Sequence, residues 1–188
     1  AFSRTLEKYA LRGKHVALLG PTSYEWIVGY FGTVNSGGVV VPIDKELPAA
    51  DICDELHRAD VEVLVYDSSY ADIAAQVRRD CPQVTSYFEM QREAHGEDVW
   101  SLRRCLEENC GAFDEPIDRE KLSVIMYTSG TTGKSKGVML NHRNLIDNVV
   151  HLEMGIEPGT AVLMTVLPIH HAYCFTCDIL KGLQLGST

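Results

Sequence analysis

One short segment of the chain gathers the residue types that bind phosphate. Residues 127–137 read YTSGTTGKSKG, in which glycines are interleaved with serine, threonine and lysine. Glycine can take the positive φ values that turn successive backbone N–H groups toward one centre, and hydroxyl and ammonium groups add further donors. The segment has little apolar surface with which to build a core. Its composition therefore predicts a site for an anion, most simply a phosphate group.

The spacing of these glycines disfavours the Walker phosphate loop. That motif places four residues between its first glycine and the Gly-Lys-Ser/Thr triplet. Here Gly130 and Gly133 enclose only Thr131 and Thr132. A phosphate site of another kind is expected.

The sequence on either side of this segment predicts ordered elements that hold it. Residues 122–128 (LSVIMYT) have the pattern of a buried strand, and residues 137–140 are a candidate short strand. Asn141 is a favoured N-cap for a following helix. That helix would carry its apolar residues at Leu145, Ile146, Val149 and Val150.

The region before the segment alternates apolar runs with amphipathic stretches. Strands are predicted at 15–20, 39–42 and 61–66, and helices at 23–38 and 49–60. The aromatic stripe of residues 23–38 is expected in the core. Strands alternating with helices at this pace predict an α/β fold, a three-layer αβα arrangement around a mostly parallel sheet.

The middle of the chain has weaker patterns. Residues 72–82 and 99–109 are predicted to be helical, and residues 89–98 and 111–120 to be polar connectors with solvated charges. The connector at 111–120 is the best internal boundary. It predicts an α/β subdomain of about 1–115, followed by a segment of about 116–188 that carries the phosphate loop and the rest of the pocket.

Composition limits the classes of partner. The chain has 188 residues, 45% of them hydrophobic, and a formal net charge of −9. This charge argues against a nucleic acid or an anionic membrane as the main partner, because both attract basic surfaces. No apolar run approaches the roughly 20 residues that span a bilayer. The N-terminus AFSRTLEKYA lacks the layout of a signal peptide, so we expect a cytoplasmic protein without a transmembrane segment.

Six cysteines are scattered along the chain, and reduced thiols are expected in preference to a disulfide framework. Cys174 and Cys177 have the C-x-x-C spacing of zinc ligands, with His170 and His171 nearby. A second cysteine pair is lacking, so buried apolar cysteines are favoured over a zinc site.

Residues 127–137 resemble the phosphate-loop signature of the adenylate-forming superfamily, which includes acyl-CoA synthetases, peptide-synthetase adenylation domains and luciferases. The superfamily pattern is Tyr-Thr-Ser-Gly-Thr-Thr-Gly-x-Pro-Lys-Gly, and this chain departs from it at Ser135, which replaces the proline. The resemblance extends upstream over residues 37–65 and downstream over residues 167–188, which resemble the segment lining the carboxylate pocket.

The downstream segment distinguishes between branches of the superfamily. Amino-acid-adenylating domains usually carry Phe-Asp near this point, with the aspartate holding the substrate's amine, whereas this chain has His170 and His171 after Leu167 and Pro168. A fatty acid has no amine to neutralise. The sequence is most similar to bacterial long-chain fatty acid CoA ligases, and an amino-acid or aryl-acid adenylation domain is the alternative.

The resemblance implies ATP-dependent activation of a carboxylate to acyl-AMP, followed by transfer to coenzyme A. It implies Mg²⁺ near Thr128, a pocket role for His171 in orienting the carboxylate and the α-phosphate, and a phosphate or loop-fixing role for Lys136. Lys134 falls at the variable position, and His170 is interpreted as structural. The residues implied to bind the nucleotide are Thr128, Ser129, Gly130, Thr131, Thr132, Gly133 and Lys136.

Several motifs that the superfamily carries further downstream are missing from this sequence. They supply an adenine-stacking aromatic residue, a magnesium-binding glutamate, a ribose-binding aspartate and an adenylation lysine. The chain is therefore interpreted as the N-terminal part of the large domain, inactive by itself and completed by the rest of that domain and a C-terminal domain. A stand-alone, non-catalytic phosphate-binding or nucleotide-binding module is the remaining alternative.

Overall fold

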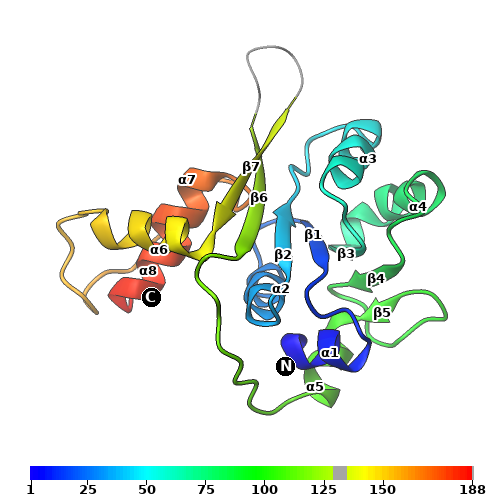
Figure 1. The fold of residues 1–188 in the computed structure, drawn as a ribbon, viewed down its shortest axis with the longest axis horizontal. Helices are drawn as coiled ribbons and strands as arrows, with labels where there is room; N and C mark the ends of the chain where they lie inside the picture. Colours follow the sequence, from blue (N-terminus) through cyan, green and yellow to red (C-terminus); the bar gives the residue numbers. More distant parts are fainter. Residues whose placement is uncertain (129–134, 188) are drawn as a thin grey trace.

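A mostly parallel β-sheet organises the chain. The computed structural model describes residues 1–128 and 135–187. The strand order is β5-β4-β3-β1-β2-β6-β7, and every neighbouring pair is parallel except β6 and β7, which are antiparallel (Figure 1). The strands are β1 (His15–Leu19), β2 (Val39–Pro42), β3 (Val63–Tyr66), β4 (Ser86–Glu89), β5 (Trp100–Ser101), β6 (Leu122–Thr128) and β7 (Lys136–Asn141).

Helices connect these strands and form the outer layers (Figure 1). They are α1 (Phe2–Lys8), α2 (Tyr24–Asn35), α3 (Ala49–Arg58), the short 3₁₀ turn η1 (Ser68–Tyr70), α4 (Ala71–Asp80), α5 (Leu102–Glu108) and α6 (His142–His151). The last helical stretch is continuous and consists of α7 (Ala172–Cys174), the π-helical turn η2 (Phe175–Leu180) and α8 (Lys181–Leu185).

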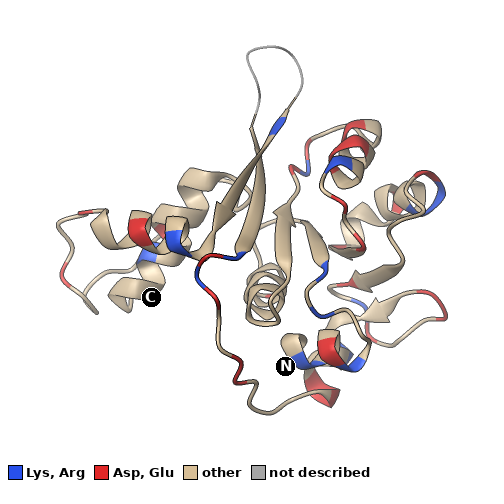
Figure 2. Cartoon of the chain, in the orientation of Figure 1, with Lys and Arg blue, Asp and Glu red and all other residues tan. Residues whose placement is uncertain are grey.

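The strands β1 to β4 are buried on both faces, as the predicted three-layer αβα fold requires. In β1, Val16 and Leu18 pack with α1, α2 and α5, while Ala17 and Leu19 pack with α3 and α4 on the opposite face. A strand that is covered on both sides has no polar face, which explains the continuous apolar runs. The strands β2 and β6 contain no charged residue, and the charges lie mainly on helices and connectors (Figure 2).

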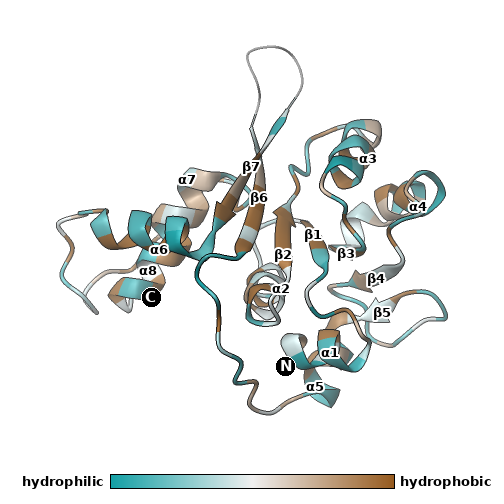
Figure 3. Ribbon diagram, viewed as in Figure 1, coloured by the Kyte–Doolittle hydropathy of each residue, from teal (hydrophilic) through white to brown (hydrophobic). Residues whose placement is uncertain are grey.

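Helix α2 supplies the largest part of the core on its face of the sheet. Ser23 is its N-cap and accepts a hydrogen bond from the amide of Trp26. Trp26 and Tyr30 are buried and stack within 6.0 Å between ring centroids, and Phe175 packs against both rings. The aromatic stripe of this helix is therefore core, as predicted. Figure 3 shows the hydrophobic character of the neighbouring strands β2 and β6.

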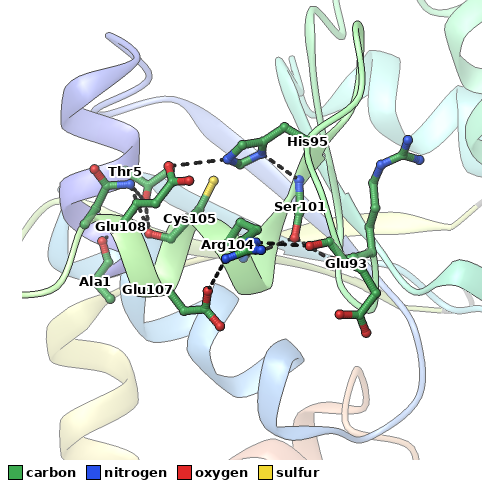
Figure 4. A network of polar contacts seen from close by, with 11 residues as sticks. Ala1, Thr5, Glu93, His95, Ser101, Arg104, Cys105, Glu107 and Glu108 are labelled. Carbon is green, nitrogen blue, oxygen red and sulfur yellow. Dashed lines mark hydrogen bonds and ion pairs between the residues drawn. The ribbon is translucent and has the colours of Figure 1, made fainter.

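A polar network ties the beginning of the chain to α5 (Figure 4). The Thr5 hydroxyl donates to the carbonyl of Cys105 at 3.3 Å, and the Asn109 side chain donates to Thr5. Ser101 caps α5 by accepting from the amide of Arg104, while the Ser101 amide donates to the ring of His95. These contacts join α5 to α1 and to the connector before β5.

The structure adds elements that the sequence patterns did not predict. They are α1, η1, β4, β5 and the helical stretch of α7, η2 and α8. The strand β5 takes Trp100 and Ser101 from the beginning of the helix predicted at 99–109. The strand predicted at 137–140 is one residue longer at each end. Asn141 caps α6 as expected and forms a capping box with Asn144. Leu145 and Val149 of that helix are buried, whereas Ile146 and Val150 are exposed.

The cysteines are free thiols, and Cys174 and Cys177 are buried, as expected for apolar cysteines. Burial raises the pKa of the Cys174 thiol to about 11.

Within residues 1–128 and 135–187, no group of three or more His, Cys, Asp and Glu side chains is arranged to hold a metal ion. In the same part of the chain, no helix has the length and apolar character needed to cross a membrane.

Candidate site for phosphate and carboxylate

A pocket of about 350 Å³ opens where β2 and β6 end. These two strands are parallel neighbours, so the segments that follow them emerge at one edge of the sheet, where α/β proteins commonly bind ligands. The polar residues that line this pocket are Asp44, Glu55, Tyr127, Thr128, Ser135, His170 and His171. The pocket therefore brings together three regions that are distant in the sequence.

Thr128 and Lys136 flank the glycine-rich segment. They are opposite residues in the antiparallel β6–β7 ladder, and the Thr128 hydroxyl lies 3.5 Å from the carbonyl oxygen of Lys136. Both residues are exposed. Thr128 lines the pocket, whereas Lys136 is not among the described lining residues. The ladder thus fixes where the segment leaves and re-enters the sheet.

The remaining predicted phosphate-binding residues lie outside the described part of the chain. They are Ser129, Gly130, Thr131, Thr132 and Gly133, and Lys134 falls in the same stretch. The anion expected from the composition of residues 127–137 stays a prediction for that reason.

His170 and His171 enter the pocket from the segment that precedes α7. The amide of His171 donates to the carbonyl of Pro168 at 3.0 Å, and the carbonyl of His171 accepts from the amide of Phe175 at 2.9 Å. His171 is thereby fixed as the residue that begins the helical stretch, and its side chain is exposed. The structure places Thr128 and His171, predicted from distant motifs, on the same pocket.

His170 occupies a more enclosed position than His171. Its side chain is 10% exposed, its Nε2 lies 3.4 Å from Oδ1 of Asp44, and its ring centroid lies 5.0 Å from that of His171. Burial lowers the pKa of His170, and the Asp44 carboxylate opposes this effect. A largely buried imidazole beside a carboxylate agrees with the structural interpretation of this residue.

Sequence analysis did not identify the acidic residues of this pocket. Asp44 follows β2, and Glu55 lies on α3 beside the buried Leu56 and three residues after the buried Ile52. Glu55 is 2% exposed, and burial raises its pKa. A carboxylate on the apolar face of an amphipathic helix was the signal that could have revealed it, because charged residues are rarely fully buried without a partner.

Hydroxyl and carboxylate oxygens are the ligand types that Mg²⁺ prefers. Thr128 could provide one of them at the mouth of the pocket, leaving the other positions to phosphate oxygens and water. Donors for phosphate among the described residues at the two ends of the glycine-rich segment include the Thr128 and Ser135 hydroxyls and the Lys136 ammonium. These residue types fit a nucleotide phosphate accompanied by a divalent cation.

Comparison with known proteins decides the family. The family described as AMP-binding enzyme matches residues 1–188, the whole chain. The chain belongs to the AMP-binding enzyme family. This result confirms the resemblance seen in residues 127–137.

Among curated relatives, a long-chain-fatty-acid–CoA ligase of Salmonella typhimurium is 24% identical over 93% of this chain. Tyrocidine synthase 2 of Brevibacillus parabrevis is 35% identical, but over 74% of the chain. The chain spans 36% of the length of the former and 3% of the latter. This AMP-binding chain therefore corresponds to a limited part of each relative.

A solved structure gives the same result for the fold. ATP-bound MatB from Rhodopseudomonas palustris matches 99% of this chain with a TM-score of 0.84 and 27% identity. The chain covers 36% of that protein. The predicted fold class, with a mostly parallel sheet between helical layers as in the N-terminal domains of adenylate-forming enzymes, is confirmed.

Proposed function

We propose that this AMP-binding chain is the N-terminal part of an acyl-CoA ligase that activates a fatty acid carboxylate with ATP. The observation that carries the proposal is the shared pocket of Thr128 and His171, because the two residues come from separate motifs with complementary roles. Thr128 adjoins the glycine-rich segment suited to phosphates, and His171 offers a ring nitrogen suited to a carboxylate. Homologues that are CoA ligases support this class of reaction.

The proposed chemistry has two steps. A carboxylate oxygen of the acid attacks the α-phosphorus of ATP, and the bond to the pyrophosphate oxygen breaks. The thiol sulfur of coenzyme A then attacks the acyl carbon, and the bond to AMP breaks. Mg²⁺, when bound, would supply positive charge against the leaving pyrophosphate.

The residues of this chain would bind and orient the reactants. Thr128 would donate its hydroxyl beside the phosphates or bind the cation through oxygen, and Lys136 would fix the phosphate loop or reach the triphosphate. His171 would donate a hydrogen bond that orients the carboxylate against the α-phosphate. Donors fixed in advance stabilise developing charge without reorganising during the reaction. Ser129, Gly130, Thr131, Thr132 and Gly133 are proposed to provide the remaining phosphate contacts.

A fatty acid is the proposed substrate class, since the sequence has two histidines where amino-acid-adenylating domains usually carry Phe-Asp. The match to tyrocidine synthase 2 keeps amino-acid adenylation as the alternative.

We further propose that residues of about 1–115 serve as an α/β subdomain and residues of about 116–188 as a phosphate-loop and pocket segment. The rest of the large domain and a C-terminal domain would complete the enzyme.

The test uses the parent enzyme that contains this chain. Pyrophosphate release is measured with ATP and Mg²⁺ and with separate panels of fatty, aryl and amino acids, followed by acyl-CoA formation. Activity confined to fatty acids supports the proposal, while activity confined to amino acids selects the alternative. ATP binding without release from any acid would leave only a nucleotide-binding role.

A histidine variant tests the role of the pocket. His171→Ala should lower kcat/KM for the acid by about tenfold to a hundredfold, because one orienting donor in the transition state is removed. His151→Ala is the control, since this histidine is exposed on α6 and its ring lies 2.7 Å from the carbonyl of Asp147 in its own helix. Equal activities of the two variants would contradict the proposed role of His171.

A further inference from the structure

Helix α3 contacts both ends of the glycine-rich segment. On the incoming side, the Tyr127 hydroxyl donates to the backbone carbonyl of Glu55 at 2.9 Å. On the outgoing side, the two terminal nitrogens of Arg58 donate to Ser135, one to its carbonyl at 2.8 Å and one to its Oγ at 2.9 Å. One turn of helix therefore contacts Tyr127, next to the last described residue before the segment, and Ser135, the first described residue after it.

The Arg58 side chain is held in place before it reaches Ser135. Its Nε donates to Oδ2 of Asp54 at 2.9 Å, one helical turn earlier. Its guanidinium lies 4.9 Å from the centroid of the Tyr127 ring. A guanidinium that is oriented by a carboxylate and stacked on an aromatic ring loses little further freedom when it donates two parallel hydrogen bonds. The Arg58 side chain is 36% exposed, so its guanidinium makes these contacts without being fully removed from water.

Glu55, on α3, lines the same pocket as Ser135. Its Oε2 has no hydrogen-bond partner among the described residues. Burial raises the pKa of Glu55, while the Ser135 hydroxyl and the Arg58 charge lower it. Asp44 and Asp54 are the other acidic groups near Glu55, and both raise its pKa. Ser135 thus lies close to both the Arg58 guanidinium and the Glu55 carboxyl group.

Position 135 is also where this chain departs from its superfamily pattern. A proline there would fix φ and provide no side-chain hydroxyl or amide N–H. Serine leaves φ free but supplies an oxygen to Arg58. The contact with Arg58 can therefore replace the stiffness that a proline would give to this end of the segment.

We propose that Arg58 is a positioning residue for nucleotide binding: by holding Ser135, it fixes the point at which the glycine-rich segment re-enters β7. The inference rests on the proposed function only in that the segment binds ATP. Arg58 itself contacts no substrate in this scheme. Its removal weakens ATP binding because Ser135 and the start of β7 then have fewer contacts, and they must be fixed in place at the expense of binding energy.

The experiment measures the equilibrium dissociation constant of ATP with Mg²⁺ for the parent enzyme by calorimetry, without any acid substrate. Arg58→Ala is expected to weaken ATP binding about fivefold to twentyfold, because it removes both charged hydrogen bonds to Ser135. Ser135→Ala removes only the hydrogen bond to Oγ and should weaken ATP binding about twofold to fourfold. The double variant should resemble Arg58→Ala alone, since both changes break the same contact. Arg58→Lys should not restore affinity, because an ammonium cannot make the paired contacts.

Arg78→Ala is the matched control. Arg78 lies on α4, donates to the carbonyl of Asp98 at 3.0 Å and stacks 4.1 Å from the centroid of the Tyr87 ring. It therefore has the same kinds of contact, with none of them made to Tyr127 or Ser135. Its replacement should leave ATP affinity within about twofold of the wild type, within the scatter expected for surface substitutions.

Hydrogen exchange of the β6–β7 peptide gives a readout that does not depend on activity. Arg58→Ala should accelerate its exchange, and Arg78→Ala should not. Unchanged ATP affinity in Arg58→Ala, or additive losses in the double variant, would overturn the inference. An enzyme that binds ATP as described but activates no acid would instead refute the proposed function and leave the role of Arg58 standing.

Discussion

Thr128 and Lys136 are the last described cross-strand pair before the glycine-rich segment, with Thr128 at the end of β6 and Lys136 at the beginning of β7. Opposite residues of an antiparallel pair have fixed spacing, so the Lys136 backbone is positioned by the same ladder that positions Thr128. Lys134 lies outside the described residues. In the superfamily pattern, Lys134 falls at the variable position and Lys136 falls at the lysine before the closing glycine.

This difference predicts unequal effects of removing each lysine. In the parent enzyme, Lys136→Ala should lower the rate of pyrophosphate release at least about tenfold, which corresponds to about 1.4 kcal/mol in the barrier. Lys134→Leu should change the rate only modestly, because a solvated charge contributes mainly long-range attraction that salt weakens. The rates are measured at saturating ATP and acid. Equal losses, or a larger loss in Lys134→Leu, would show that the roles of the lysines are reversed.

The lowered pKa of His170 predicts that the unfolding free energy of the protein depends on pH. Its pKa is lowered in the folded chain by burial, so below the ordinary histidine pKa of about 6.5 the unfolded chain binds more protons than the folded one. Protonation therefore favours unfolding, and stability falls as the pH decreases below about 6.5. The slope from one such group is at most about 1.4 kcal/mol per pH unit.

The measurement is the unfolding free energy of the parent enzyme from denaturant titrations between about pH 5 and pH 8. His170→Gln should flatten the acidic part of this curve. His142, whose pKa is also lowered by burial, accounts for a part that remains. If the curves of His170→Gln and the wild type are parallel, His170 is not the titrating group.

The sequence predicted the elements whose signals are local. The strands β1, β2, β3 and β6 are apolar runs, and α2 and α6 are directly preceded by Ser23 and Asn141, which are favoured N-caps. In contrast, β5 is only two residues long and exists because it pairs with β4, so no local pattern could reveal it.

The same distinction explains what could be predicted of the site. Thr128 and His171 were found through motifs, but the roles of Glu55 and Arg58 depend on partners 72 and 77 residues away. No periodicity in the sequence encodes those contacts. The fold class could be predicted from local sequence patterns, whereas the contacts of α3 with Tyr127 and Ser135 could be found only in the tertiary structure.

A third prediction concerns the close approach of α1 and α2. A Cβ at Gly32 would lie 2.6 Å from Cβ of Phe2, a buried residue of the core. Gly32→Ala should therefore destabilise the chain by about 1–3 kcal/mol despite the higher helix propensity of alanine, because the two helices must separate. Thermal unfolding of the parent enzyme measures the loss.

Gly29→Ala is the comparison for this effect. A Cβ at Gly29 would meet Cδ2 of Leu18 at 3.0 Å, which is the end of a flexible side chain and can shift. The destabilisation should be clearly smaller than that of Gly32→Ala. A Gly32→Ala variant as stable as the wild type would mean that α1 does not dock on α2 as described.

The last prediction is that residues 1–188 alone release no pyrophosphate from ATP. The chain spans 36% of the length of the fatty acid CoA ligase that it matches, and the motifs with which the superfamily binds adenine and ribose do not occur in this sequence. Binding energy from remote parts of a substrate is needed for orientation at the reacting atoms, so losing those contacts lowers the rate as well as the affinity. The chain is incubated with ATP, Mg²⁺, palmitate and coenzyme A, with the parent enzyme as the positive control. Turnover of about 1 per second, an ordinary enzyme rate, would show that the chain contains a complete active site.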